Sequence, residues 1–300
     1  MHQASRQVEG FSLLLEKFKR NISLQGRSPK TFENYSRHVA AIALHYNCLP
    51  TLLDAEQVKD YLYLLQQRSK TPSQTYFKHT VYGLRFILKT KGFAYDHLHL
   101  PSIAKSTKLP VVLSKQEVWQ MLKVPILLKH KVLIALLYGC GLRCSEVSKL
   151  ELRHIDFDRE TIHIVQSKGN KDRILPMGVS LKRVLQKYVL AEKPEQYLFT
   201  GQMNETNTGE KMYSSRGIQW AVKTIAKQAG ISKVVHTHTM RHTYACHCLE
   251  NGMNIVTLKD LLGHKNIETT MEYLKICQLD DKRVFNPLDN LFAQCGRSTK

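Results

Sequence analysis

Apolar residues recur at helical spacing through the first hundred residues. Two stripes follow the period of an α-helix: Phe11, Leu14, Leu15, Phe18 and Ile22, then Val58, Tyr61, Leu62 and Leu65. Between them, Ser28 precedes Pro29, a pair typical of a helix start with proline at the first helical position. Residues 75–91 form a further helical pattern, which Gly92 is suited to end. The pattern predicts a helical unit over residues 8–100.

A connector then separates this unit from a second one. Residues 100–114 hold two prolines among small and basic residues, which is typical of a linker. We place the linker at residues 104–113, between a helical domain at residues 1–103 and a second domain at residues 114–300.

The second domain mixes helical and alternating patterns. Ser114 and Glu117 predict a capping box, and the apolar helix at 130–138 is expected to end at the glycines of YGCG. Residues 161–165 and 172–176 alternate at period two around QSKGNK, which predicts a hairpin, and residues 197–201 suggest one more short strand. From residue 215 onward the pattern is helical. The expected fold is mainly α with a small antiparallel sheet.

Charge adds the first functional indication. The 300 residues carry a formal net charge of +19, with 16 Lys and Arg against 7 Asp and Glu in residues 1–110 and 28 against 18 in the remainder. Because both halves are basic and both have folded patterns, we expect two domains that clamp a polyanion, most plausibly a DNA duplex, rather than a basic tail.

Other features of composition narrow the class of protein. The N-terminus has no apolar leader, and the longest apolar run, residues 132–142, is too short to span a membrane. Seven scattered cysteines without a Cys-x-x-Cys pair favour a reducing compartment. We therefore expect a cytoplasmic protein with no membrane partner.

Four stretches of the second domain carry candidate chemistry. In GCGLRCSEV, Arg143 stands at a helix start where it could grip an anion or pair with Glu146. QSKGNKDR places Lys168 and Lys171 at a hairpin tip, suited to reach into a groove. His238 and Arg241 are one helical turn apart, which suits two donors to one phosphate.

The same helix allows a different interpretation. His238, His242 and Cys246 recur at intervals of four residues and could line a metal-binding face. The basic charge favours an anion site over a cation site, and no carboxylate cluster or glycine-rich nucleotide loop is evident. We predict no metal and no cofactor.

The last stretch is LLGHKNIETTMEYLKI, residues 261–276. Gly263 is expected to end a helix, so that His264 emerges in a turn. Ile267, Met271 and Leu274 are expected to form the core stripe of the next helix, with Tyr273 beside that stripe. Alone, Tyr273 would be one half-buried aromatic among thirteen tyrosines; with the arginines and histidines it could serve as a nucleophile toward a phosphodiester.

The order and spacing of these stretches resemble the tyrosine recombinases, or phage integrase family, especially the Xer-type and mobile-element integrases. The matching stretches are GLRCSEV, SKGNKDR, HTMRHTYACH and LLGHKNIETTMEY, within residues 112–276. Residues 8–100 resemble the family's helical, SAM-like core-binding domain, above all at SPKTFENYSRHV. The resemblance implies a catalytic domain with the DNA breaking-rejoining enzyme fold.

The resemblance also implies a role for each matching residue. Tyr273 would be the nucleophile that forms a 3′-phosphotyrosyl link, and Arg143 and Arg241 would hold the scissile phosphate. Lys168, a better match than Lys171, would protonate the leaving 5′-oxygen. The remaining roles are these: His238 exchanges the Tyr273 proton, His264 donates to the phosphate, and Glu146 buttresses Arg143.

The implied partners and alternatives follow from the family. Its members act as homotetramers on two double-stranded recombination sites, exchange strands through a Holliday junction without ATP, and can require an accessory protein. Protomers exchange a C-terminal segment, for which residues 280–294 are the candidate. Two alternatives stay open: a catalytically silent DNA-binding regulator of the same fold, and a relaxing topoisomerase of related chemistry.

Overall fold

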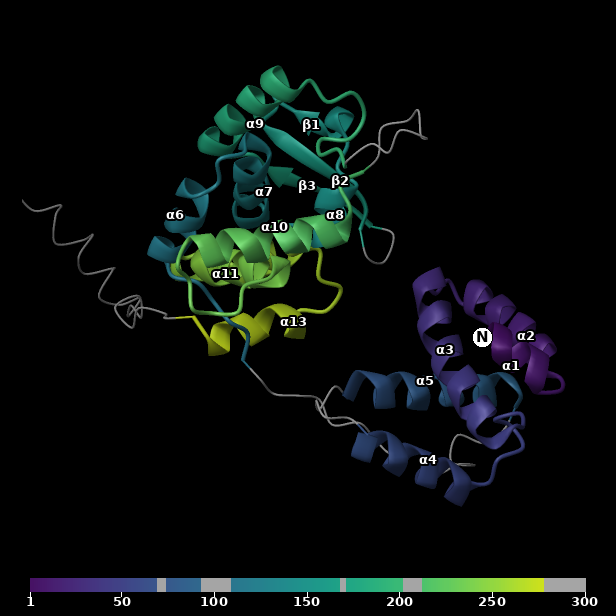
Figure 1. Ribbon diagram of the computed structural model, residues 1–300. Helices are drawn as coiled ribbons and strands as arrows, with labels where there is room; N and C mark the ends of the chain where they lie inside the picture. The colour runs from purple at the N-terminus through teal and green to yellow at the C-terminus, as the bar shows by residue number, and fades with distance from the viewer. Residues whose placement is uncertain (69–73, 93–108, 168–170, 202–211, 278–300) are drawn as a thin grey trace, which may run out of the picture. The chain divides into compact units, whose positions relative to one another are not determined.

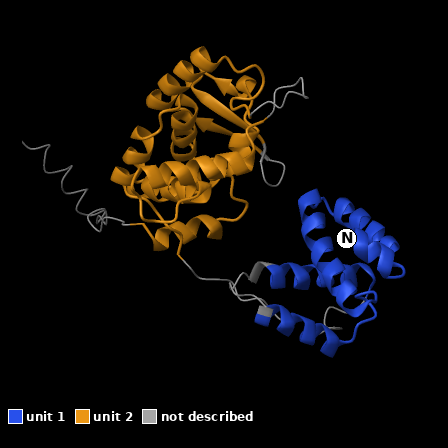
Figure 2. Ribbon diagram, in the orientation of Figure 1, with its two compact units in different colours: residues 1–107 blue, residues 108–300 orange. Residues whose placement is uncertain are grey.

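The chain folds into two compact units, residues 1–107 and 108–300 (Figure 2). The computed structural model describes residues 1–68, 74–92, 109–167, 171–201 and 212–277. The expected linker at 104–113 lies partly outside the described residues, and the domain limits of the sequence analysis stay a prediction.

The first unit is helical, as its apolar spacing predicts. Its helices are α1 (His2–Gln7), α2 (Phe11–Leu24), α3 (Pro29–Tyr46), α4 (Ala55–Arg68) and α5 (Gln74–Thr90). Ser28 caps α3 by accepting a hydrogen bond from the backbone N–H of Thr31, with Pro29 at the first helical position. The short α1 precedes the region that the pattern identified; its buried Ala4 joins the core formed with Phe11 and Phe18 of α2.

Helices α3 and α5 pack closely at the centre of this unit. A Cβ at Gly83 of α5 would lie 2.9 Å from Val39 of α3, so only glycine allows this approach. Ile42 of α3 and Leu84 of α5 belong to a second apolar cluster, shared with Val58 of α4. The α3–α5 pair therefore connects the two cores of the unit.

The second unit is mainly helical around a small antiparallel sheet (Figure 1). Its elements are α6 (Lys115–Lys123), α7 (Leu128–Gly139), α8 (Cys144–Ser148), the 3₁₀ helix η1 (Leu152–His154), β1 (Ile155–Asp156), β2 (Thr161–Ser167), β3 (Lys171–Pro176), α9 (Val179–Glu192), α10 (Ser215–Gln228), α11 (Thr237–Glu250), α12 (Ile255–Leu262), α13 (Glu268–Met271) and the 3₁₀ helix η2 (Glu272–Lys275). The strands pair in the order β1-β2-β3. The predicted fold class is confirmed.

Several local predictions are also confirmed in this unit. Ser114 and Glu117 form the capping box of α6, and β2 pairs with β3 as an antiparallel hairpin. Apolar α7 is the central helix: Val132, Leu133 and Leu136 are fully buried in the core.

One strand differs from the prediction. Residues 197–201 make two isolated bridges, Glu151 with Tyr197 and Thr200 with Met212, and the sheet instead gains the two-residue β1. Leu198 and Phe199 are buried, so their apolar character serves the core rather than a regular ladder. Within the described ranges, no helix has the length and apolar character needed to cross a membrane.

Candidate active site

The turn between α7 and α8 depends on a glycine. Gly141 has φ +59°, and a Cβ there would overlap the ring of Tyr244 on α11. The turn makes Arg143 the N-cap residue of α8. The Arg143 backbone N–H and Nη1 donate to the two carboxylate oxygens of Glu146, at 2.8 and 2.7 Å, while its Nη2 donates to the Gly263 carbonyl at 3.1 Å. Arg143 is thereby fixed in orientation.

Glu146 also pairs with a second arginine, Arg173, which the sequence analysis did not single out. Arg173 of β3 donates from Nη1 and Nη2 to the two oxygens of Glu146, at 3.0 and 2.8 Å, and from Nε to the Leu261 carbonyl at 2.8 Å. Burial alone would raise the pKa of Glu146, but hydrogen bonds from Arg173 and Arg143 lower it to about 2. Glu146 is therefore ionised and shared. In the sequence, Arg173 stands two residues before Leu175, which is buried. Because side chains alternate along a strand, this spacing puts both on the inward face of the strand and could have identified Arg173.

Arg241 of α11 is the most deeply buried of the predicted site residues, with 3% of its surface exposed. Its Nη1 donates to the Gly141 carbonyl at 2.8 Å, and its Nη2 donates to the Leu262 carbonyl at 2.6 Å. Burial and then the charge of Arg143 lower its pKa to about 10, so the guanidinium is still protonated at neutral pH. The two carbonyls tie α11 to the turn before α8 and to the end of α12.

The hydrogen bonds of His264 define its tautomer. Gly263, with φ +63°, ends α12 in the left-handed conformation, and His264 follows in the turn as predicted. Arg241 Nη2 lies 3.0 Å from His264 Nε2, and because arginine only donates, Nε2 is an acceptor. The proton is then on Nδ1, which donates to Thr270 Oγ1 at 2.9 Å. Burial, followed by the neighbouring arginines, lowers the His264 pKa to about 4, so the ring is neutral.

Tyr273 lies on η2, is 4% exposed and faces this cluster. Its ring stacks against His264, with centroids 6.2 Å apart. Burial raises the pKa of the hydroxyl, while Arg241 and Arg143 act in the opposite direction. The tyrosine is therefore protonated at rest, and the two arginines offset part of the cost that burial places on its anion.

The predicted core stripe of this last helix is wrong. Met271 and Leu274 are 48% and 36% exposed, whereas Thr270 and Tyr273 are buried. The α-helix α13 continues into the 3₁₀ helix η2, and positions 270 and 273, three residues apart, share the buried face. Tyr273 thus lies at the centre of the buried face rather than beside it.

A second histidine of α11 contacts the Tyr273 hydroxyl. His242 Nδ1 lies 3.2 Å from Tyr273 Oη. His238, to which the sequence analysis gave the proton exchange, is exposed and stacks on His242 with ring centroids 6.2 Å apart. The sequence analysis had considered His242 only as a metal ligand. The four-residue spacing from His238, which puts both rings on one face of the helix, could have placed it at the site. Cys246 lies in the core, and in the described part of the chain no group of three or more His, Cys, Asp or Glu side chains is arranged to hold a metal.

The hairpin lysines complete the account of the predicted residues. Lys168 lies outside the described residues. Lys171 begins β3, the strand that carries Arg173 into the site. The structure therefore brings Arg143, Glu146, Arg241, His264 and Tyr273 together.

The assembled site is unbalanced in charge. Three guanidinium groups, of Arg143, Arg173 and Arg241, surround a single carboxylate, that of Glu146. The excess positive charge lies next to the buried Tyr273 hydroxyl and two histidines, His242 and His264, whose lowered pKa keeps them neutral. Such an arrangement can bind an anion and stabilise further negative charge on it.

Comparison with protein families gives a match to the model of the phage integrase family over residues 112–278. A putative integrase/recombinase of Sinorhizobium fredii, y4qK, is 30% identical over 268 residues, covering 88% of this chain and 84% of that protein. Tyrosine recombinase XerA of Pyrococcus horikoshii is 30% identical over 266 residues, covering 88% of this chain and 89% of its own length.

Solved structures share the fold. The Tn1549 transposon integrase in complex with transposon right end DNA aligns with a TM-score of 0.67 at 17% identity, over 96% of this chain and 99% of that one. A crystal structure of XerA recombinase aligns with a TM-score of 0.51 at 21% identity, over 95% and 98% of the two chains.

Proposed function

The chain belongs to the phage integrase family and is a tyrosine-type site-specific DNA recombinase, and from this premise we propose that it cuts and rejoins DNA through a 3′-phosphotyrosyl intermediate at Tyr273. The observation that carries the proposal is the Tyr273 hydroxyl, buried beside His264 and Arg241 in a site with excess guanidinium charge.

The proposed cleavage step conserves the phosphodiester's energy. Tyr273 Oη attacks the scissile phosphorus, the bond from phosphorus to the 5′-oxygen breaks, and Lys168 gives that oxygen a proton. Arg143 and Arg241 hold the non-bridging oxygens, where negative charge grows in the transition state. Because one ester replaces another, rejoining is the reverse reaction and needs neither ATP nor a cofactor.

The supporting residues have separate tasks in this proposal. Glu146 fixes Arg143 and Arg173 and does not react. To donate to the bound phosphate, His264 gives up its contact with Arg241 and carries its proton on Nε2, while Nδ1 accepts from the Thr270 hydroxyl. His238, at the open edge of the site, takes part in exchanging the Tyr273 proton with solvent.

We extend the proposal to the assembly that the family implies. Both units of the chain are basic, and we assign residues 1–103 to DNA binding beside the catalytic domain. Four protomers would act on two duplexes in the cytoplasm of a prokaryote, with strand exchange through a Holliday junction. The segment proposed to pass between protomers, residues 280–294, lies outside the described residues. An accessory protein is a further expected partner.

Covalent capture tests the proposal. Nicked duplexes tiled across the DNA that flanks the chain's gene are incubated with the protein in EDTA, and adducts are separated by denaturing electrophoresis. We expect one duplex to be captured, with the DNA mapped to Tyr273 by mass spectrometry. An adduct that persists in Tyr273→Phe would refute the assignment.

The same material separates the two alternative activities. Specific binding without capture on any bound duplex would indicate a DNA-binding regulator. Relaxation of a supercoiled plasmid that carries the captured site, without exchange between two such sites, would indicate a topoisomerase.

A further inference from the structure

The Tyr273 hydroxyl has an immediate neighbour for its proton. His242 Nδ1 lies 3.2 Å from Tyr273 Oη, and the ring centroids are 5.6 Å apart at an angle of 51°. His242 is half-buried on α11, whereas His238 is exposed and one helical turn away. His242 thus lies between the nucleophile and His238.

The protonation state of Tyr273 suits one direction of this hydrogen bond. Burial raises the pKa of the Tyr273 hydroxyl, with Arg241 acting against it, so the hydroxyl keeps its hydrogen at rest. A phenol hydroxyl can donate that hydrogen to an imidazole nitrogen that carries a lone pair. The contact of 3.2 Å therefore suits donation from Tyr273 Oη to His242 Nδ1.

The charge state of His242 suits an acceptor. Burial, and then the charges of His238 and Arg241, lower its pKa to about 4. At neutral pH the ring is uncharged, with a lone pair available on one nitrogen. A bound phosphate would offset the positive charge of Arg241 and make the ring more basic only when substrate is present.

We infer that His242, rather than His238, orients the Tyr273 hydroxyl and accepts its proton during attack on the phosphate. This inference rests on the proposed function. As the bond from Tyr273 Oη to phosphorus forms, the proton moves to His242 Nδ1, and the 5′-oxygen leaves with a proton from Lys168. In rejoining, the 5′-hydroxyl attacks phosphorus and gives its proton back to Lys168, while the imidazolium of His242 returns its proton to Tyr273. His238, stacked on His242, is the next ring toward solvent.

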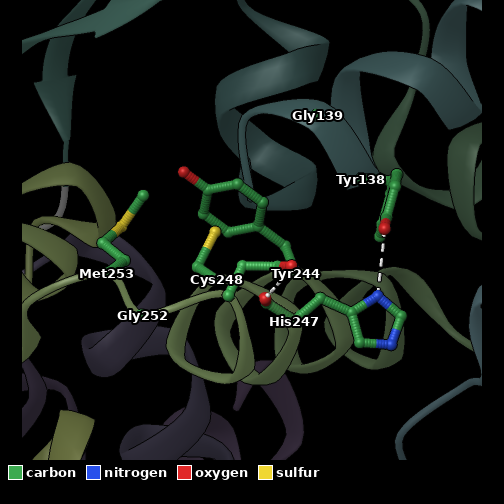
Figure 3. A pocket seen from close by; sticks show the side chains of 8 residues that line it. Tyr138, Gly139, Tyr244, His247, Cys248, Gly252 and Met253 are labelled. Carbon is green, nitrogen blue, oxygen red and sulfur yellow. Dashed lines mark hydrogen bonds between the residues drawn. The ribbon is translucent and has the colours of Figure 1, made fainter. Parts of the chain in front are cut away.

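The chain contains a matched control for this pair. His247, on the same helix, places its Nδ1 2.9 Å from the hydroxyl of Tyr138 on α7. Figure 3 shows this pair at a pocket that Tyr244, Cys248 and Met253 also line. His247 is buried and shares the same type of contact, but Tyr138 has no assigned part in the reaction.

A measurement without DNA tests the geometry. In protein labelled with ¹⁵N at histidine, Tyr273→Phe is expected to shift the Nδ1 resonance of His242 and leave that of His247 in place. Tyr138→Phe is expected to do the reverse. An unchanged His242 resonance in Tyr273→Phe overturns the inference, whatever the protein does to DNA.

Kinetics on the captured duplex test the chemistry. His242→Asn keeps an acceptor near the Nδ1 position but cannot take up the proton, so we expect phosphotyrosine formation to slow at least 100-fold. The loss should be the same on a duplex with a 5′-bridging sulfur, because a thiolate leaves without needing an acid. The matched variant His247→Asn should stay within threefold of wild type.

Each result of these kinetic experiments supports or overturns the role of His242. A His242→Asn rate within threefold of wild type, or a loss restored by the bridging sulfur, overturns the inference. Free imidazole should restore part of the rate to His242→Ala, which a purely structural role would not allow. Adduct formation by Tyr273→Phe would instead refute the proposed function itself.

Discussion

Helix α11 carries two histidines that each bring Nδ1 to a tyrosine hydroxyl, in opposite electrostatic surroundings. Around His242 and Tyr273, the neighbouring charges are Arg241 and Arg143. Around His247 and Tyr138, the effects of Cys248 and Glu250 add to burial and raise the pKa of the tyrosine further. The charges near Tyr273 offset part of the effect of burial on its anion, whereas the charges near Tyr138 add to that effect.

The difference shows that a histidine–tyrosine contact does not by itself make a nucleophile. Burial raises the pKa of both hydroxyls. Only at Tyr273 do guanidinium groups act against burial, and only there can the same groups hold a phosphate. Charge rather than contact geometry separates the two pairs.

Removing each hydroxyl gives the largest expected contrast. Tyr273→Phe should abolish the covalent adduct, because no other hydroxyl lies at that point among the residues that form the site. Tyr138→Phe should change the rate of adduct formation by less than threefold. Capture on the same nicked duplex measures both. Equal loss in the two variants would mean that the hydroxyls act through stability rather than chemistry.

Replacing the Arg241 guanidinium with a cation of another shape should give the next largest effect. Arg241→Lys replaces a planar group that contacts Gly141, Leu262 and His264 with one ammonium. We expect adduct formation to slow by about 10³-fold, as for the loss of a transition-state donor. Single-turnover kinetics at saturating duplex measure this, with Lys259→Arg, on the neighbouring α12, as the control for basic charge. A loss under tenfold would contradict the assignment.

Glu146 is expected to affect stability more than any single histidine. In Glu146→Gln, Arg143 and Arg173 lose the charge that both contact. We expect the free energy of unfolding at pH 7 to fall by on the order of 3 kcal/mol. Urea unfolding measures this, and Glu117→Gln, which removes a more exposed ion pair, should cost less than 1 kcal/mol.

The sign of the pH dependence follows from the lowered pKa of Glu146. The stabilisation that the ionised Glu146 gives the folded state is fully present above pH 4.5, the ordinary pKa of a glutamate. It is lost as pH falls toward the pKa of about 2 in the folded protein. Wild type should therefore lose stability through this window more steeply than Glu146→Gln. Parallel slopes would mean that the carboxylate is not held by the arginines.

The histidine pairs should differ in a higher pH window. His242 faces His236, His238 and Arg241 on α11 and lies against Tyr273 and His264. Because its pKa is lowered, the stabilisation that neutral His242 gives the folded state is present above pH 6.5, the ordinary pKa of a histidine. It is lost as pH falls toward the pKa of about 4 in the folded protein. His242→Asn should lose less stability than wild type over that range, by about 2 kcal/mol after allowance for partial exposure.

His247→Asn is the comparison for this measurement. Burial lowers the His247 pKa too, but Glu250 and a backbone hydrogen bond with Leu113 raise it. The loss of stability of His247→Asn with falling pH should therefore lie closer to that of wild type. Thermal unfolding at pH 6.5, 5.5 and 4.5 gives both slopes, and a larger effect for His247→Asn would reverse the ranking of the two environments.

Much of this site could be predicted because its residues stand in short, ordered stretches. The helical periods predicted the helices, period-two alternation predicted the β2–β3 hairpin, and Gly263 predicted the turn that presents His264. The spacing of His238 and Arg241 placed them one turn apart, but spacing does not say which ring is turned inward. The contact of His242 with Tyr273 needed the packing of η2 against α11.

Two further features were decided by tertiary packing. Arg173, which the sequence analysis did not single out, lies on the inward face of β3 because Glu146 of α8 pairs with it there. The buried face of α13 and η2 carries Thr270 and Tyr273 rather than Met271 and Leu274, and each pair is three residues apart. Spacing alone therefore could not say which pair is buried, and the packing of Tyr273 with Ala245 and Cys246 of α11 decides it.

The smallest predicted effect tests this last point directly. Met271→Gln changes an exposed side chain, so the free energy of unfolding should change by less than about 0.5 kcal/mol. Thr270→Gln, one position earlier, forces a larger polar group into a fully buried site and removes the partner of His264 Nδ1, and it should cost more than about 2 kcal/mol. A buried stripe through Ile267, Met271 and Leu274 would give the opposite order. Urea unfolding of the two variants therefore separates the two possible buried faces, and the face that carries Thr270 is the one from which the Tyr273 hydroxyl reaches His242.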